Sequence, residues 1–192
     1  MELLKNEISA CTTCAKHLPL GPRPVVQFSS ESAIAIIGQA PGTKVHASGI
    51  PWDDQSGKRL RSWLGATPEV FYNTDNFAIV PMGFCYPGKG KSGDLPARPE
   101  CAPQWHDSIF NELKNIKLIL LIGTYAQQYY LGNNKRKTLT ETVEHFEEYG
   151  PRFFPLPHRS PRNGIWLRKN DWFEKAVVPA LEIQVRSILL SK

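Results

Sequence analysis

AIAIIGQAPG, residues 33–42, is the stretch of this chain that decides its fold. Its first half, Ala33–Ile37, is a short run rich in isoleucine, which is typical of a strand buried on both faces of a sheet. Its second half, Gly38-Gln39-Ala40-Pro41-Gly42, is a loop of small residues. This loop lacks both the G-x-G-x-x-G spacing and the Lys-Ser/Thr ending of nucleotide-binding loops. Taken alone, it predicts only a turn from a strand into a helix.

Similar apolar runs alternate with helical patterns along the rest of the chain. Three further strands are predicted, at Phe77–Met82, Lys117–Ile122 and Arg152–Leu156. Apolar side chains at helical spacing predict helices at Gly57–Leu64, Asp107–Asn115, Thr124–Leu131 and Trp172–Leu190. We expect Thr124 to cap its helix and Pro179 to kink or restart the last one.

This alternation predicts an α/β fold with a central, mainly parallel sheet flanked by helices. The length of 192 residues and the hydrophobic content of 41% fit a single domain spanning residues 1–192. The polar stretch Lys135–Tyr149 is compatible with either a hairpin or a helix.

Charge and hydropathy narrow the class of protein. No apolar run is long enough to cross a membrane, and the first ten residues lack the apolar core of a signal peptide. We therefore expect a cytoplasmic protein in a reducing compartment. The net charge of +5 favours a polyanionic partner, although many enzymes that never bind nucleic acid carry a similar charge.

The four cysteines form two spaced pairs. Cys11 and Cys14 make a C-x2-C, and Cys85 and Cys101 enclose fifteen residues rich in Pro, Gly and Lys. Four thiolates in this arrangement suit one zinc ion or an iron-sulfur cluster. Two disulfides or four free buried thiols are the alternatives, and a reducing compartment argues against disulfides.

In open α/β sheets, ligands bind beyond the carboxyl ends of the strands. The loops that follow the first and fourth predicted strands are Gly38–Gly42 and His158-Arg159-Ser160-Pro161-Arg162-Asn163. Both contain small or proline-fixed residues that let backbone amides approach a ligand. These two loops are therefore the candidate binding loops.

Taken together, these segments resemble the uracil-DNA glycosylase superfamily over nearly the whole chain, and most closely its iron-sulfur branch, the family-four enzymes. Cys11-Thr12-Thr13-Cys14 resembles the N-terminal C-x2-C of that branch, and Gly21–Val26 resembles its Gly-Arg-x-Val-Val element. Gly38–Gly42 is similar to its first motif, Gly49-Ile50-Pro51-Trp52 to its Gly-x-Pro-Phe segment, and Cys85 and Cys101 to its later cysteine pair. His158 matches the start of the second motif, whose continuation Ser160–Asn163 looks more like the single-strand-selective uracil glycosylases.

The resemblance implies a single glycosylase-like domain with an N-terminal cluster-binding segment and a 4Fe-4S cluster held by Cys11, Cys14, Cys85 and Cys101. Zinc remains the alternative metal. In such a site, His158 stabilises the departing base and Trp52 stacks on the flipped base. Gln39 and Ala40 are expected beside the base as well.

The expected DNA contacts come from the loop after the fourth strand and from basic residues near both loops. Ser160 and the backbone would bind phosphate, and Arg162 would act as a wedge or strand contact. The other expected contacts are Arg159, Asn163, Lys89 and Lys91. Each of the lysines and arginines could equally be an ordinary solvated side chain.

The chain departs from the family pattern at positions that matter for chemistry. Gln39 stands where family four has glutamate, and Thr43-Lys44-Val45 offers no acidic residue after the motif. Pro81 falls where the family has the asparagine that reads uracil. Asp53 and Asp54 are the candidate replacements for the missing carboxylates. We expect Asp54 to cap the following helix and Asp53 to be open to a catalytic role.

The sequence thus predicts a monomeric DNA glycosylase that removes a flipped, deaminated base, uracil or a related one, from single- or double-stranded DNA in base-excision repair. The assigned catalytic residues are His158, Gln39 and Asp53. Two alternatives remain. One is a DNA-binding member with altered base specificity or no glycosylase activity, and the other is a nucleoside hydrolase, which the basic loops disfavour.

Overall fold

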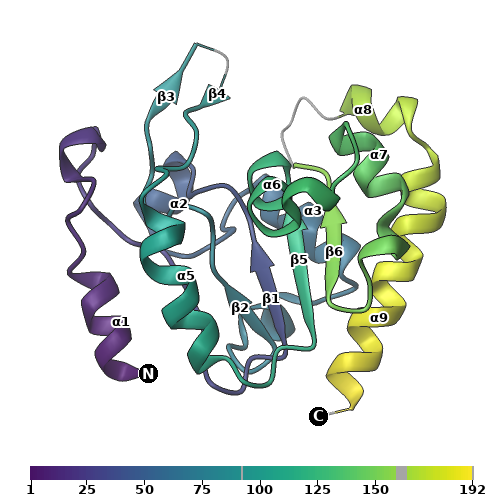
Figure 1. Cartoon of the computed structure of the whole chain (residues 1–192), viewed down its shortest axis with the longest axis horizontal. Helices are drawn as coiled ribbons and strands as arrows, with labels where there is room; N and C mark the ends of the chain where they lie inside the picture. Colours follow the sequence, from purple (N-terminus) through teal and green to yellow (C-terminus); the bar gives the residue numbers. More distant parts are fainter. Residues whose placement is uncertain (92, 159–163, 192) are drawn as a thin grey trace.

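The computed structural model of this chain describes residues 1–91, 93–158 and 164–191. A four-stranded sheet forms its centre, in the spatial order β2-β1-β5-β6 (Figure 1). All neighbouring strands are parallel, which confirms the predicted α/β fold. The strands are β1 (Ile34–Ile37), β2 (Phe77–Ile79), β5 (Leu118–Ile122) and β6 (Phe153–Leu156). Each begins within one residue of its predicted start.

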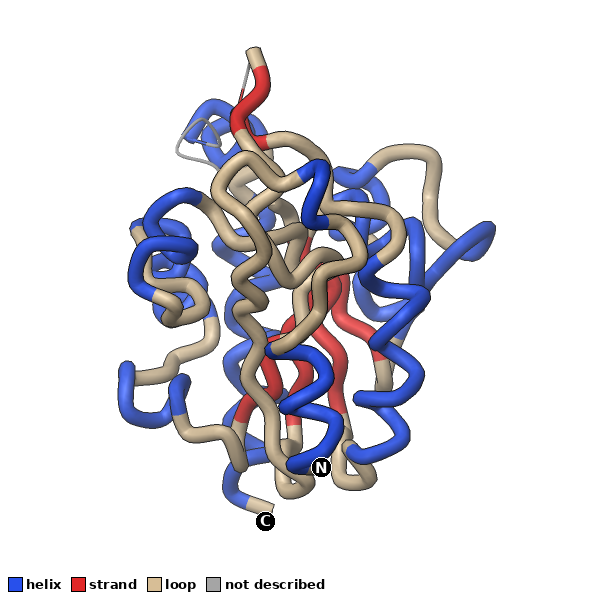
Figure 2. The backbone as a smooth tube through the Cα atoms, turned by 90° about the vertical axis from the view of Figure 1, so that its left-hand side faces the viewer, coloured by secondary structure: helices blue, strands red, loops and turns tan. Residues whose placement is uncertain are grey.

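Alternate residues of each strand point to opposite faces, and helices cover both (Figure 2). Ile34 and Ile36 pack with helices α3, α4, α7 and α9, whereas Ala35 and Ile37 pack with α1, α5 and α6. Burial on both sides explains why the strands are continuously apolar. These helices are α1 (Glu2–Ser9), α3 (Gln55–Trp63), α4 (Pro68–Tyr72), α5 (Cys101–Glu112), α6 (Thr124–Leu131), α7 (Leu139–Glu144) and α9 (Val178–Leu190).

Short elements complete the described chain. Helix α2 (Thr43–Ser48) follows the loop after β1, and α8 (Gly164–Lys169) precedes the C-terminal helix. A small antiparallel hairpin, β3 (Lys89–Gly90) and β4 (Gly93–Asp94), rises above the carboxyl ends of the strands (Figure 1). It lies within the stretch between Cys85 and Cys101, which is rich in Pro, Gly and Lys.

Two helix predictions were wrong in detail. Helix α5 begins at Cys101, six residues before the predicted start at Asp107, because Pro103 lies in the first turn, where its missing N–H breaks no helical bond. Thr124 does not cap α6. The cap position belongs to Gly123, whose φ of +85° is in the left-handed region, and Thr124 is the first helical residue.

The stretch from 135 to 149 is helical and not a hairpin. Thr138 and Glu141 form a capping box that starts α7, and a 3-10 turn, Phe146–Tyr149, follows that helix. At the C-terminus, a π-helical turn, Phe173–Val177, runs directly into α9, which has Pro179 in its first turn, so the helical pattern changes beside Pro179 without a break in the chain's helical backbone. None of the described helices has the length and apolar character needed to span a membrane.

The strand order fixes where a ligand site can form. From β1 the chain continues to β2 on one side, and β5 then pairs with the other side of β1. The carboxyl ends of β1 and β5 therefore mark a switch point, where the loops diverge and leave a crevice. Loop 38–42 follows β1 at this point, and Gly123 follows β5.

Candidate functional site

A cavity of about 630 Å³ lies at the switch point. Its walls come from the loop after β1, the segment before α3, the hairpin, and the end of β6. The structure thus brings together segments that are distant in sequence. Most of the lining belongs to Gly38, Gln39, Ala40, Pro41, Gly42, Lys44, Val45, Pro51, Trp52, Asp54, Gln55, Ser56, Pro81, Gly93, Asp94 and His158.

Trp52 is one of the residues that line this cavity. A Cβ atom at residue 38 would lie 2.9 Å from Cζ2 of Trp52, so the ring packs directly on the backbone of Gly38. Trp52 has a φ of +56° and is the only non-glycine residue with a positive φ in the described part of the chain. A bulky side chain in this backbone region costs about 1–3 kcal/mol and persists only where its surroundings hold it.

The two adjacent aspartates have different positions. Asp54 lines the cavity and caps α3, where its Oδ1 accepts a hydrogen bond of 2.8 Å from the Gly57 N–H. The predicted capping role is confirmed. Asp53 is exposed and lies outside the cavity lining, so the structure does not bring it together with the other predicted site residues.

Replacing Asp54 with alanine is expected to lower the free energy of unfolding by about 1 kcal/mol, because an unpaired N–H is left at the start of α3. The matched variant Asp53→Ala should change it by less than about 0.5 kcal/mol, since this side chain is exposed. Urea denaturation measures both. Equal losses in the two variants would contradict the capping assignment.

His158 lines the cavity and lies against Gly123, the residue that follows β5. A Cβ atom at residue 123 would come within 3.0 Å of the His158 Cβ, so glycine is needed there for this approach. The buried side chain of Gln127 donates hydrogen bonds to Leu121 O and Leu156 O, which ties the ends of β5 and β6 together. Of the five histidines, all within the described residues, only His158 lines the cavity.

Gln39 and Ala40 both line the cavity, as predicted. The side-chain Nε2 of Gln39 donates a hydrogen bond of 2.9 Å to Leu95 O, just after β4. This bond holds the base of the hairpin against the loop that follows β1. The amide nitrogen is thereby engaged, and the Oε1 of Gln39 remains as an acceptor.

Sequence reasoning missed a buried network behind Pro81. His106, on α5, is 1% exposed, and its ring nitrogens contact Pro81 O at 3.0 Å and the Tyr130 hydroxyl at 2.6 Å. Since a carbonyl oxygen only accepts, Nε2 carries the proton and Nδ1 accepts from Tyr130. The Pro81 carbonyl is thus bound from behind the cavity wall.

His106 should make stability depend on pH. Burial lowers its pKa from the ordinary 6.5 to about 4. Between these values the unfolded chain binds more protons, so the free energy of unfolding falls as the pH drops through this window, by at most about 3 kcal/mol. His106→Gln should lose this part of the pH dependence, and His145→Gln, an exposed control, should keep it. Identical pH slopes for His106→Gln and wild type in urea denaturation would contradict the prediction.

The four cysteines are free thiols gathered from separate segments, and none is in a disulfide. Burial raises the pKa of Cys101 to about 12 and that of Cys85 to about 11. Negative charge on Cys14, Cys85 and Cys11 would also raise the pKa of Cys101, which places all four sulfurs in one neighbourhood. Within the described residues, no three Cys, His, Asp or Glu side chains are grouped closely enough to hold a single metal ion.

Hydrogen-bond donors surround these sulfurs. The Phe84 N–H donates to the Cys101 sulfur at 3.3 Å. Burial pushes the pKa of Cys11 upward, but hydrogen bonding to the side chain and backbone of Thr13 contributes most to outweighing burial, so the pKa is lowered. The Trp105 ring nitrogen is buried and has no well-formed hydrogen bond to any described residue.

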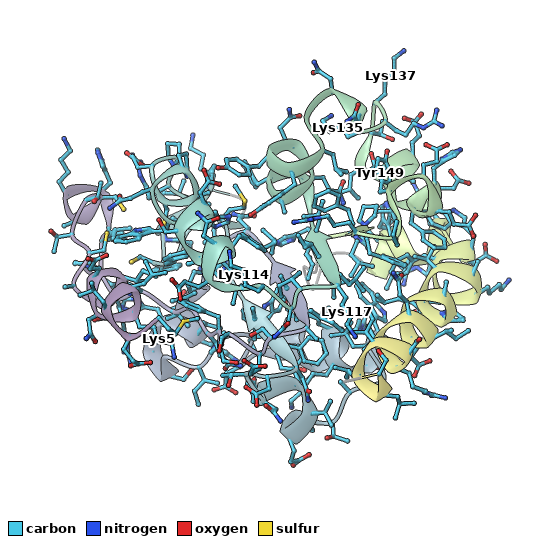
Figure 3. The ribbon with its side chains drawn as sticks, turned by 60° about the horizontal axis from the view of Figure 1, so that its bottom comes forward. Lys5, Lys114, Lys117, Lys135, Lys137 and Tyr149 are labelled. Carbon is cyan, nitrogen blue, oxygen red and sulfur yellow. The ribbon has the colours of Figure 1, made fainter. Side chains whose placement is uncertain are left out.

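The predicted basic contacts are only partly described. Lys89 and Lys91 are exposed on the hairpin, whose strand β4 lines the cavity. The predicted contacts Arg159, Ser160, Arg162 and Asn163 lie outside the described residues. Other lysines, labelled in Figure 3, project from α1, from the turn before β5 and from the segment after α6, and none of them lines the cavity. Net charge alone therefore does not identify a binding face.

The sequence profile of the uracil DNA glycosylase superfamily matches residues 25–182. This range includes all four strands of the sheet, the loop after β1, Trp52 and His158. It begins after the C-x2-C, so the match does not extend to Cys11 and Cys14. Because the match covers most of the chain and all of the cavity lining, the protein belongs to the uracil DNA glycosylase superfamily.

Proposed function

We propose that the protein is a DNA glycosylase that hydrolyses the N-glycosidic bond of a deaminated base after the base has left the helix. The observation that carries the proposal is that Trp52 and His158 line one cavity at the switch point of the sheet. A volume of about 630 Å³ is within the usual range for sites that enclose a small molecule.

Bond cleavage places positive charge on the sugar and negative charge on the departing base. His158 donates a hydrogen bond to the base oxygen and stabilises the negative charge. The Trp52 ring offers a flat face that recovers part of the stacking lost when the base leaves the helix, worth about 1–3 kcal/mol.

Base recognition differs from that of a family-four enzyme. Pro81 has no side-chain donor or acceptor, and its carbonyl is already bound by His106. The base edge is therefore read by backbone groups of loop 38–42, including Ala40, and by the Oε1 of Gln39. We expect excision of uracil to be slow, or another deaminated base to be preferred.

Because Gln39 replaces the glutamate of family four, another carboxylate is needed to orient the water that attacks the sugar. Two line the cavity, Asp54 and Asp94, and Asp53 does not. The variants Asp54→Asn and Asp94→Asn separate them, since a large loss of single-turnover rate is expected only where the carboxylate holds the water. Asp53→Asn is the control.

A substrate panel tests the function. Oligonucleotides with uracil, hypoxanthine or xanthine, in single and double strands, are incubated with the protein and then cleaved with alkali at abasic sites. We expect release of at least one of these bases. Uracil excision as fast and selective as that of a typical family-four enzyme would contradict the altered recognition. Failure on every substrate would contradict the glycosylase proposal.

A second candidate function is DNA binding with no glycosylase activity. It is favoured by the amide at Gln39, where the family has a carboxylate, and by the engagement of this amide with Leu95 O. In that case, damaged DNA is bound in a salt-dependent manner and remains uncut in the same panel. The proposed DNA contacts in either case are Lys89, Lys91, Arg159, Ser160, Arg162 and Asn163.

We also propose that Cys11, Cys14, Cys85 and Cys101 hold a 4Fe-4S cluster. Support comes from four unpaired cysteines in one neighbourhood, and from the buried Trp105 N–H beside Cys11. The cluster would connect the N-terminal segment to α5. We further propose that the protein is a monomer and acts in the cytoplasm.

A further inference from the structure

Arg61, on helix α3, binds the backbone of Trp52. The carbonyl oxygen of Trp52 accepts a hydrogen bond of 3.3 Å from Nη1 of Arg61. The same nitrogen donates to the Tyr72 hydroxyl at 3.2 Å. Arg61 thereby joins the backbone of Trp52, a residue of the cavity lining, to helix α4.

Arg61 is itself fixed by aromatic rings. Its guanidinium carbon lies 5.4 Å from the ring centre of Phe71 and 5.5 Å from that of Tyr72. Phe71 is fully buried, and the Tyr72 carbonyl accepts a hydrogen bond from Gln27. These contacts restrict the motion of the guanidinium, so it can hold the Trp52 carbonyl in place.

Gly57 leaves room for this carbonyl. A Cβ atom at residue 57 would lie 1.8 Å from the Trp52 oxygen, which no side chain can tolerate. The N–H of Gly57 is held by Asp54 at the same point. Arg61 thus binds the Trp52 carbonyl, and Gly57 leaves the space that this carbonyl needs.

We infer that Arg61 is a positioning residue that maintains the left-handed backbone of Trp52 and so presents its ring to the cavity. Without Arg61, Trp52 can relax toward an ordinary backbone conformation, and its ring leaves Gly38. The effect on cleavage rests on the proposed function, but the effect on the order of Trp52 does not.

The first test measures the order of Trp52 directly. The protein has five tryptophans, so its 15N-1H spectrum contains five indole signals, and the one lost in Trp52→Phe belongs to Trp52. In Arg61→Met, which keeps an apolar stem between the rings, we expect this signal to shift or broaden. Arg59→Met, an exposed arginine on the same helix, should leave it unchanged. An unaltered Trp52 signal in Arg61→Met would overturn the inference.

The second test is a double-mutant cycle on the single-turnover rate with a base that the wild type removes. We expect Arg61→Met to slow cleavage on the order of 10-fold in the wild-type background and hardly at all in Trp52→Ala, because the effect acts through the ring. Equal losses in both backgrounds would overturn the inference. If the wild type cleaves nothing while the indole signal responds as expected, the proposed function fails and the positioning role stands.

Discussion

Replacing His158 with alanine is expected to reduce single-turnover cleavage on the order of 10²-fold or more. The negative charge of the departing base must be stabilised within the cavity, and loss of one aligned donor from such a site typically has an effect of this size. DNA affinity and its dependence on salt should change little, because phosphate contacts supply most of the binding. Cleavage rate and binding isotherm are measured on the same oligonucleotide.

His145→Ala is the matched control. This histidine is exposed on the segment after α7, and its Nδ1 contacts Glu141 O, away from the cavity lining. The His145→Ala variant should therefore cleave at the wild-type rate. If His158→Ala also cleaves at that rate, or loses only binding, then His158 has a structural or DNA-contacting role. The leaving-group donor would then be sought at Lys44, the other basic side chain in the lining.

The sheet was predictable from the sequence because its strands are buried on both faces. Such strands must be apolar at every position, and Ile34–Ile37 and Leu118–Ile122 contain no polar residue. Helix limits were less accurate, since they depend on local chemistry. The cap at Asp54 was recognised, whereas the early start of α5 at Cys101 was hidden by Pro103.

The candidate site was predictable where residues lie in loops that follow strands. Gln39 and His158 belong to such loops, and Trp52 was assigned by resemblance; all three line the cavity. Contacts between distant segments were not predictable. Gln39 binds the carbonyl of a residue 56 positions later, and Asp94 reaches the cavity through a hairpin that has no clear local signal.

Replacing Cys85 with alanine is expected to abolish iron binding. It should also unfold the segments that the cysteines connect, which are the N-terminal segment and the stretch between Cys85 and Cys101. Cys85 lies four residues after Pro81, which lines the cavity. Cys101 is the first residue of α5, and its sulfur accepts a hydrogen bond from the N–H of Phe84, seventeen residues earlier. In the described part of the connection between Cys85 and Cys101, the only regular structure is a hairpin with two residues in each strand, too small to be stable alone. Loss of the anchor should therefore release this connection and the N-terminal segment together.

Wild-type protein purified without oxygen should be brown, with broad absorbance at about 400 nm and about four irons per chain, as thiolate-bound iron-sulfur centres have. Cys85→Ala should be colourless, with a much lower unfolding midpoint. Thr13→Ala, beside Cys11 but without a thiolate, should keep its colour. Colourless wild-type protein with stoichiometric zinc would exclude the cluster and retain a four-thiolate site. Metal-free protein with an unchanged midpoint in Cys85→Ala would instead make the cysteines free thiols that pack as small apolar side chains. The Gln39 hydrogen bond to Leu95 O and local packing would then hold the hairpin beside the cavity.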